Sequence, residues 1–272
     1  MSLISFYLRL ICLDLPRLSY RLSGDRFVYG VLLYARLFFF LVTRKTVFRG
    51  VPMRFNFTVN AVRFSLDLRS PVDIAPLVEL YVRREYEVAF PHTPDTIIDL
   101  GANYGDSTLY FHTLFPNARI FAVEPSPQSF ERLRAHVAPY TNITPVHALV
   151  SDSNGSGILN LTDSGSLGNS IIERASSTSV TVPSYTLDAL ISHLGLTTVD
   201  LIKFDIEGAE GRIFRKREQA VCAQMFLGEV HEDLMEVPKD DFLNTFSDFS
   251  VVLTPLKNPM RSILFATKRV NR

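Results

Sequence analysis

A glycine-containing turn is the first feature of this sequence that could do chemistry. Asp99, Gly101, Asn103 and Gly105 stand in IIDLGANYGDS, between an apolar run and a stretch with helical spacing. Glycine lets the backbone turn sharply and approach a ligand closely, because it has no Cβ. In open α/β sheets, ligands lie beyond the carboxyl ends of the strands, where this turn would fall. The turn is therefore a candidate cofactor site.

The acidic residues near this turn indicate which cofactor it would hold. Glu124 ends the next apolar run, where a carboxylate can accept hydrogen bonds from both hydroxyls of a ribose. A dinucleotide site needs G-x-G-x-x-G, but Asn103 stands where the second glycine would admit the pyrophosphate. Asp99 would repel phosphate and suits the positively charged methionine part of S-adenosylmethionine. Asp152, after the third apolar run, could reach an adenine amino group or be a simple turn residue.

A second set of residues could activate a hydroxyl group. Asp205 and Glu207 follow the fourth apolar run, and His231 follows the fifth. An aliphatic hydroxyl is a weak nucleophile until a base takes its proton. His231 is the first candidate for that base, because the ordinary pKa of histidine lies near physiological pH. Glu207 is the second, and Asp205 could hold the methionine amine or the substrate.

Two alternatives remain open for these acidic residues. Glu207 and Glu210 could instead cap the helix expected from Gly208, where carboxylates favour the helix dipole. A divalent cation held by Asp205, Glu207 or His231 could also activate the hydroxyl. Because carboxylate clusters alone are poor evidence of a metal, the sequence assigns no metal ligands.

The elements that must position these residues form an α/β pattern. Short apolar runs alternate with helical stretches, which is typical of parallel strands joined by crossover helices. Two late runs, joined by TPLKNPMR, read as an antiparallel hairpin at the sheet edge. The predicted fold is a doubly wound, mostly parallel seven-stranded sheet with a C-terminal antiparallel hairpin. The expected strands are Thr96–Leu100, Arg119–Val123, Ile143–Val150, Val199–Phe204, Met225–Val230, Phe249–Leu253 and Ser262–Thr267.

Other segments surround this sheet. Alternation in Met53–Leu68 predicts a hairpin that turns near Asn60, and helical spacing predicts a helix over Asp73–Phe90. The Ser- and Gly-rich stretch from Thr162 to Ser179 reads as a long loop, either a flap over the substrate or an uninvolved surface excursion.

Residues 1–50 differ from the rest, and we expect a helical extension there, followed by a catalytic domain over 51–272. Lys plus Arg equals Asp plus Glu at 28 each in the whole chain, so nucleic acid is not an expected partner. The run FVYGVLLYARLFFFLV is short for a membrane span and contains Arg36. The extension could lie on an anionic membrane surface, or pack on the domain or in a dimer. We expect a cytoplasmic protein, with membrane association and oligomeric state left open. The basic residues of the extension are Arg9, Arg17, Arg21, Arg26, Arg36, Arg44, Lys45 and Arg49.

Several motifs together resemble the FkbM family of S-adenosylmethionine-dependent methyltransferases, over about Met53 to Thr267. They are REYE, IIDLGANYGDSTLYF, FAVEPSPQSFERLRAHV, ALVSDSNG, TLDAL, LIKFDIEGAE and GEVH. LIKFDIEGAE is the most specific of them, whereas Tyr104 departs from the Ile or Val that similar proteins often have.

The resemblance implies a Rossmann-like class I methyltransferase fold and O-methylation of a hydroxyl on a sugar or other small molecule or natural product. It implies that the turn residues 99, 101, 103 and 105 line the methionine side of the cofactor, Glu124 the ribose and Asp152 the adenine. Two rival functions are an NAD-dependent oxidoreductase on a similar sheet and a catalytically silent, membrane-associated scaffold. The missing third glycine argues against the oxidoreductase, and the intact turn argues against the silent scaffold.

Overall fold

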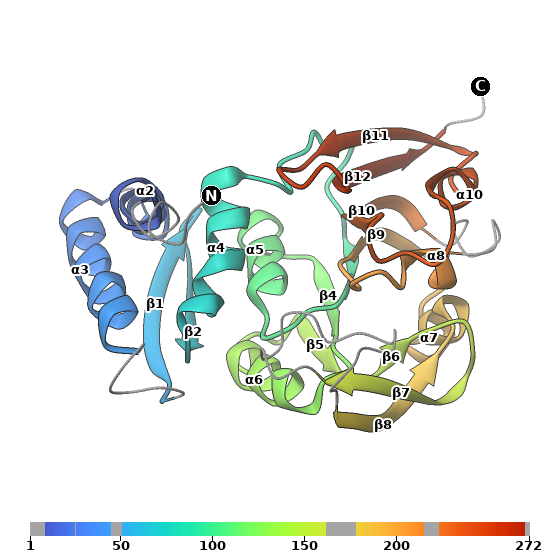
Figure 1. Ribbon diagram of the computed structural model, residues 1–272, viewed down its shortest axis with the longest axis horizontal. Helices are drawn as coiled ribbons and strands as arrows, with labels where there is room; N and C mark the ends of the chain where they lie inside the picture. Colours follow the sequence, from blue (N-terminus) through green and yellow to red (C-terminus); the bar gives the residue numbers. More distant parts are fainter. Residues whose placement is uncertain (1–8, 25, 45–50, 162–177, 215–222, 270–272) are drawn as a thin grey trace. The chain divides into compact units, whose positions relative to one another are not determined.

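The computed structural model describes residues 9–24, 26–44, 51–161, 178–214 and 223–269 (Figure 1). The chain divides into two compact units, residues 1–87 with 109–116 and residues 88–108 with 117–272. The expected Ser- and Gly-rich loop lies outside the described residues, apart from its last two positions, which begin a strand.

The first unit combines the N-terminal helices with the predicted hairpin. A π-helical turn over Leu10–Asp14 leads into α2 (Leu15–Arg21) and α3 (Phe27–Arg44). The hairpin of β1 (Met53–Val59) and β2 (Val62–Leu68) is confirmed. Its turn residues Asn60 and Ala61 have φ values of 49° and 64°. This left-handed pair matches the twist that tight hairpins require.

The hairpin packs with the helices of this unit. Phe40 of α3 meets Phe55 edge to face, with ring centroids 5.6 Å apart, and Phe57 and Phe64 continue the row of rings. The Thr58 amide also donates to the Leu22 carbonyl at 2.7 Å. The hairpin therefore groups with the helices before it, because they share a core. The boundary expected at residue 50 stays a prediction.

The helix expected over Asp73–Phe90 is shorter than predicted. The segment consists of a 3₁₀ turn over Pro71–Ile74, α4 (Ala75–Val78) and a π turn over Glu79–Arg83. It ends at Arg84, whose φ of 60° is left-handed and cannot continue a helix. Among the described helices, none is both long and apolar enough to pass through a bilayer.

The second unit contains the predicted seven-stranded sheet, in the order β11-β12-β10-β9-β3-β4-β5. The strands from β10 to β5 pair in parallel, and β12 is antiparallel to both β10 and β11. The mostly parallel sheet and its C-terminal hairpin are therefore confirmed. The strands are β3 (Thr96–Leu100), β4 (Arg119–Val123), β5 (Ile143–Val146), β9 (Val199–Phe204), β10 (Ala223–His231), β11 (Phe249–Pro255) and β12 (Arg261–Lys268).

One expected strand, Ile143–Val150, is divided between two sheets. Its first half is β5, at the edge of the main sheet, and its second half is β6 (Leu149–Val150). β6 pairs with β8 (Thr178–Tyr185), which also pairs with β7 (Gly155–Leu161). Pro145 lies in β5, and an edge strand tolerates proline because its outer side needs no N–H donor.

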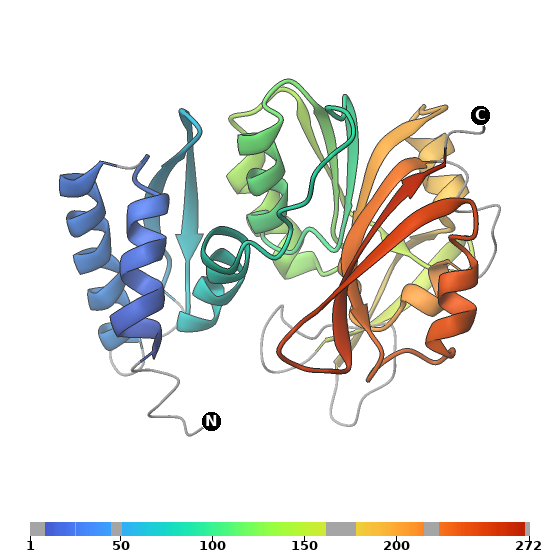
Figure 2. The ribbon, with the colours of Figure 1, turned by 90° about the horizontal axis from the view of Figure 1, so that it is seen from above.

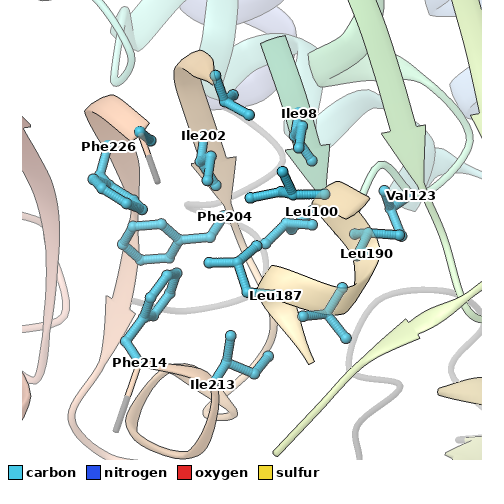
Figure 3. Packing of buried hydrophobic residues seen from close by; sticks show 14 of the residues in the cluster. Ile98, Leu100, Val123, Leu187, Leu190, Ile202, Phe204, Ile213, Phe214 and Phe226 are labelled. Carbon is cyan, nitrogen blue, oxygen red and sulfur yellow. The ribbon is translucent and has the colours of Figure 1, made fainter. Parts of the chain in front are cut away.

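The main core lies on one face of the sheet, under α7 (Leu187–His193), α8 (Glu210–Ile213) and α10 (Lys239–Asn244). Phe214 is central there, with its ring 5.1 Å from that of Phe204 and 5.7 Å from that of Phe226 (Figure 3). α6 (Pro127–Val137) lies on the opposite side of the parallel strands (Figure 2). Aromatic pairs at these separations add to the stability that burial provides.

The strand order reverses between β3 and β9. From β3 the chain builds outward through β4 to β5, then returns to the other side of β3 to form β9 and β10. Ligands of doubly wound sheets bind at the carboxyl ends of the strands, where the order reverses. Both groups of candidate residues lie at this edge.

Candidate functional site

The turn after β3 has the backbone that its sequence predicts. Gly101, Asn103 and Gly105 have φ values of 74°, 49° and 99°, all in the left-handed region. A Cβ on Gly101 would stand 2.0 Å from the carbonyl oxygen of Asp205. Glycine is therefore required at position 101 for steric reasons as well as for its φ. The turn leads into α5 (Asp106–Leu114).

Asp99 lies beneath the turn, where it is fully buried. Its carboxylate pairs with Lys203 Nζ at 2.9 Å and accepts hydrogen bonds from the hydroxyls of Ser107 (2.7 Å) and Thr108 (2.6 Å). The sequence-based hypothesis gave Asp99 to the methionine amine. In the structure its oxygen atoms pair with these three side chains, and its role at the methionine side stays a prediction.

Lys203 is a site residue that the sequence analysis did not select. Its ammonium donates to the carbonyls of Gly101 (3.0 Å) and Leu100 (3.3 Å), so it holds the turn from below. Burial lowers the pKa of Lys203, but the attraction of Asp99, Asp205 and Asp106 outweighs burial and raises it overall. The available signal was a lysine inside the otherwise apolar strand VDLIKF, where a charge needs a buried partner.

Glu124 stands at the carboxyl end of β4 and contacts the turn. Its carboxylate accepts hydrogen bonds from the backbone N–H groups of Asn103 and Ser126, each at 2.8 Å. Burial raises the pKa of Glu124 to about 7, although these two hydrogen bonds oppose the shift. The structure thus brings Glu124 together with Asn103, as a site for a ribose would require.

Two polar atoms at the turn suit a ligand with hydrogen-bond donors. Asn103 Oδ1 and Asp106 Oδ1 are buried, and neither accepts a hydrogen bond within the part of the chain that the structure describes. Burial raises the pKa of Asp106 to about 7, while the charge of Lys203 opposes the shift. Buried acceptors without partners are costly, so they favour a site that a ligand completes. Sequence reasoning missed Asp106.

Asp152 is the last of the predicted cofactor residues. It follows β6 of the small sheet, not a strand of the main sheet, and it is exposed. The Ser151 hydroxyl donates to its carboxylate at 3.2 Å. Its role at an adenine stays a prediction.

The acceptor residues converge as their positions in the sequence suggested. His231 ends β10, and its Nε2 lies 3.7 Å from Asp205 Oδ1 and 3.9 Å from Glu207 Oε2. Glu229 Oε1 lies 3.6 Å from the same nitrogen. Glu207 has a φ of 52°, which is uncommon for a residue with a side chain.

The other ring nitrogen of His231 is fixed by Glu210. His231 Nδ1 and Glu210 Oε1 are 2.7 Å apart, and both residues are 0 % exposed. Glu210 Oε1 also accepts from the Gly208 amide at 3.2 Å. Glu210 is therefore more than the helix cap considered from the sequence, because its main partner is the imidazole.

This environment argues against His231 as the general base. Burial lowers the pKa of His231, but the hydrogen bond to Glu210 and the charges of Asp205, Glu210 and Glu229 raise it to about 9. At neutral pH the imidazole then already carries its second proton and cannot accept another. Asp205 and Glu207 are partly exposed carboxylates beside this nitrogen.

Comparison with known proteins identifies the class to which this fold and site belong. Residues 99–250 match the family described as the Methyltransferase FkbM domain. This match spans more than half of the chain, and the protein belongs to the FkbM methyltransferase family. The resemblance seen in the sequence is thereby confirmed.

Individual relatives have related descriptions. The 2-O-methyltransferase NoeI of Sinorhizobium fredii is 28% identical over 178 residues, which cover 58% of this chain and 72% of that protein. Among solved structures, fibrillarin of Aeropyrum pernix with natively bound S-adenosyl-L-methionine is similar with a TM-score of 0.46. It has 15% identity, over 80% of this chain and 84% of that chain. The METTL16 MTase domain has a TM-score of 0.47 and 12% identity, over 88% and 81%.

Proposed function

We propose that this methyltransferase uses S-adenosylmethionine to methylate a hydroxyl group of a sugar or another small molecule. The observation that carries the proposal is the glycine turn at the point of strand reversal, with Glu124 held against it through the Asn103 amide. Membership of the FkbM family supports the methyl transfer. The description of one relative as a 2-O-methyltransferase supports oxygen as the acceptor atom.

The residues at the turn fit this cofactor. In the proposal, Glu124 accepts hydrogen bonds from the ribose hydroxyls, and Asn103 Oδ1 and Asp106 Oδ1 accept them from the methionine amine. Gly101 and Gly105 let the backbone approach the ligand. Asp99 acts indirectly, through Lys203 and the carbonyls that Lys203 holds. Asp152 is assigned to the adenine amino group.

The chain's own residues then prepare the acceptor. When bound, the sulfonium centre supplies an electrophilic methyl group. In-line displacement depends mainly on the position of the acceptor oxygen behind that carbon. Asp205 and Glu207 orient the acceptor hydroxyl, and one of the two carboxylates accepts its hydrogen bond and then its proton. The protonated His231 stabilises both carboxylates at 3.7 and 3.9 Å.

Calorimetry with S-adenosylhomocysteine tests the cofactor assignment. The wild-type chain is expected to bind it, and Glu124→Ala to bind it at least about tenfold more weakly, because the carboxylate's hydrogen bonds to ribose are lost. Glu131→Gln, an exposed change on α6, is the matched control. Binding of NAD in place of S-adenosylhomocysteine would contradict the proposal. Cofactor binding without any transfer of a labelled methyl group from it to extract molecules would indicate a silent scaffold.

We also propose that the first unit contacts an anionic membrane surface. One stripe of α3 is exposed and apolar, although such residues normally face a core. Val28, Leu32, Phe39 and Val42 recur along it at helical spacing, with exposed fractions between 54% and 67%. Exposed Arg17, Arg21 and Arg26 supply the positive charge that anionic lipid attracts. An apolar face with basic residues is typical of helices that lie in the interface.

Flotation of the full chain with vesicles tests this contact. Vesicles with anionic lipid are expected to carry the wild-type chain, whereas the triple change Val28→Ser, Leu32→Ser, Phe39→Ser should remain unbound. Ile158→Ser removes an equally exposed apolar residue from β7 and should float normally. If the wild-type chain stays in solution as a dimer that the triple change dissociates, the stripe is a self-association surface and the membrane proposal fails.

A further inference from the structure

Acidic side chains gather around one face of the buried imidazole at the end of β10. Asp205, Glu207 and Glu229 place carboxylate oxygens 3.6 to 3.9 Å from His231 Nε2. That nitrogen is buried and makes no hydrogen bond to any described residue. A buried polar atom without a hydrogen bond is costly, so its position needs an explanation.

The distances themselves suggest what belongs between these atoms. A hydrogen bond from an N–H group to oxygen has a length of about 2.7 to 3.2 Å, so 3.7 and 3.9 Å are too long for one. Two ligands that are each about 2.1 Å from one ion are about 3.0 to 4.2 Å apart, depending on the angle between them. The ligand atoms of Asp205, Glu207 and His231 all lie within 4.8 Å of one another. Such spacing fits a shared cation after a small contraction.

The opposite side of the ring is prepared for the same purpose. Metal-binding histidines commonly donate their second ring N–H to a carboxylate, which fixes the tautomer and directs the free nitrogen at the ion. Glu210 is that partner for His231, at 2.7 Å and fully buried. Glu210 therefore acts as a positioning residue.

We propose that Asp205, Glu207 and His231 form a binding site for a first-row divalent cation, which replaces the proton on His231 Nε2 when it binds. Imidazole is a ligand for transition metals, and carboxylates bind Mn²⁺ and harder ions. Mg²⁺ prefers a site made of oxygen atoms alone, so this mixed set of ligands favours Mn²⁺. Three protein ligands leave open positions for the oxygen of a substrate. Arg261 forms ion pairs with both Glu229 and Asp233, each at 3.4 Å. Because Glu229 is paired in this way, we place it next to the site and not among the ligands.

The cation site would add to the proposed function. Its catalytic role rests on that function, whereas the existence of the site does not. An acceptor hydroxyl bound to the cation has a lowered pKa. With both carboxylates occupied as ligands, its proton leaves to solvent and not to Asp205 or Glu207. The oxygen lone pair then forms the new C–O bond as the C–S bond of the sulfonium breaks. Sulfur keeps that electron pair and becomes a neutral thioether, so the charges balance.

Electron paramagnetic resonance tests the binding without any methyl transfer. The full chain is treated with chelator, desalted and titrated with Mn²⁺, whose sharp aqueous signal falls when the ion is bound. We expect one saturable site per chain. Asp205→Asn and Glu207→Gln should each weaken it by about tenfold or more, and Glu210→Gln by about tenfold, because changes next to metal ligands usually cost 10- to 100-fold in affinity.

Controls keep the result open to refutation. Glu131→Gln on α6 removes an acidic residue elsewhere and should leave Mn²⁺ affinity unchanged. Because His231→Ala could disturb the buried pair with Glu210, the two partly exposed carboxylate variants serve as the main test, with circular dichroism to verify folding. Wild-type protein that binds no Mn²⁺, or binds it equally with both carboxylates replaced, would overturn the site. Calorimetry with S-adenosylhomocysteine in chelator separates this failure from failure of the cofactor assignment.

Discussion

At the scale of single residues, the site stands out for its buried ionisable groups. Glu124 and Asp106 both have pKa values raised to about 7, mainly by burial. Lys203 and Asp99 form a pair that is almost fully buried. Breaking such a pair from one side usually costs several kcal/mol, since an uncompensated charge remains. Lys203 joins Asp99 to the carbonyls of the turn, and Glu124 contacts the turn through the Asn103 amide.

Glu124 should make stability fall as pH rises. Its pKa is about 7 in the folded protein, whereas the ordinary value is 4.5. Its contribution to the free energy of unfolding is therefore complete below pH 4.5 and is lost as the pH rises toward 7. Glu124→Gln cannot ionise and escapes this loss. Between pH 5 and pH 8 the variant should gain about 2 to 3 kcal/mol relative to wild type. Urea unfolding across that range measures the difference, and a difference that does not vary with pH would contradict the assigned environment.

At the scale of elements, the strands follow closely from the sequence. The runs Thr96–Leu100, Arg119–Val123 and Val199–Phe204 are predicted to the residue, because apolar runs between turn signals define buried strands well. The break after Val146 was not predictable, since the apolar residues continue and only pairing with β8 separates Leu149 from β5. The Glu210 to His231 contact was missed for the same reason, because it depends on where two strands end in space.

The turn between β3 and α5 allows a matched test of its glycine. Gly101 and Gly195 have similar φ values, 74° and 68°, but a Cβ on Gly195 would meet nothing within 4 Å. Gly195→Ala should therefore cost about 1 to 2 kcal/mol, which is the left-handed penalty alone. Gly101→Ala adds a collision with backbone and should cost about 3 kcal/mol or more. Urea unfolding of both variants measures this, and equal losses would show that the close approach to Asp205 is not rigid.

At the scale of the whole molecule, the single helix α5 contributes residues to both units. Its first residues group with the second unit, and residues 109–116 group with the first. Within the first unit, Tyr110 meets Tyr81 at 5.4 Å and Phe111 stacks on Tyr86 at 6.2 Å. The sequence alone could not predict these ring contacts, because they join segments that lie far apart in the chain.

A fragment of residues 88–272 should consequently be less stable than the full chain. It would retain Tyr110 and Phe111 but lose their aromatic partners, which exposes apolar surface that favours aggregation. We expect a lower Tm and stronger binding of a hydrophobic dye than the full chain shows. A fragment that melts like the full chain and binds no dye would establish that the second unit folds independently.

The junction between β3 and β9 has a consequence for how such an enzyme could change its substrate. The Asp205 amide donates to the Leu100 carbonyl at 3.1 Å, and Gly101 leaves no space beside the Asp205 carbonyl. The same stretch of backbone would thus position both the methyl donor and the oxygen that receives the methyl group, and it would fix the distance between them. Selectivity for new acceptors would have to come from segments remote from that junction, leaving the reacting geometry as it is.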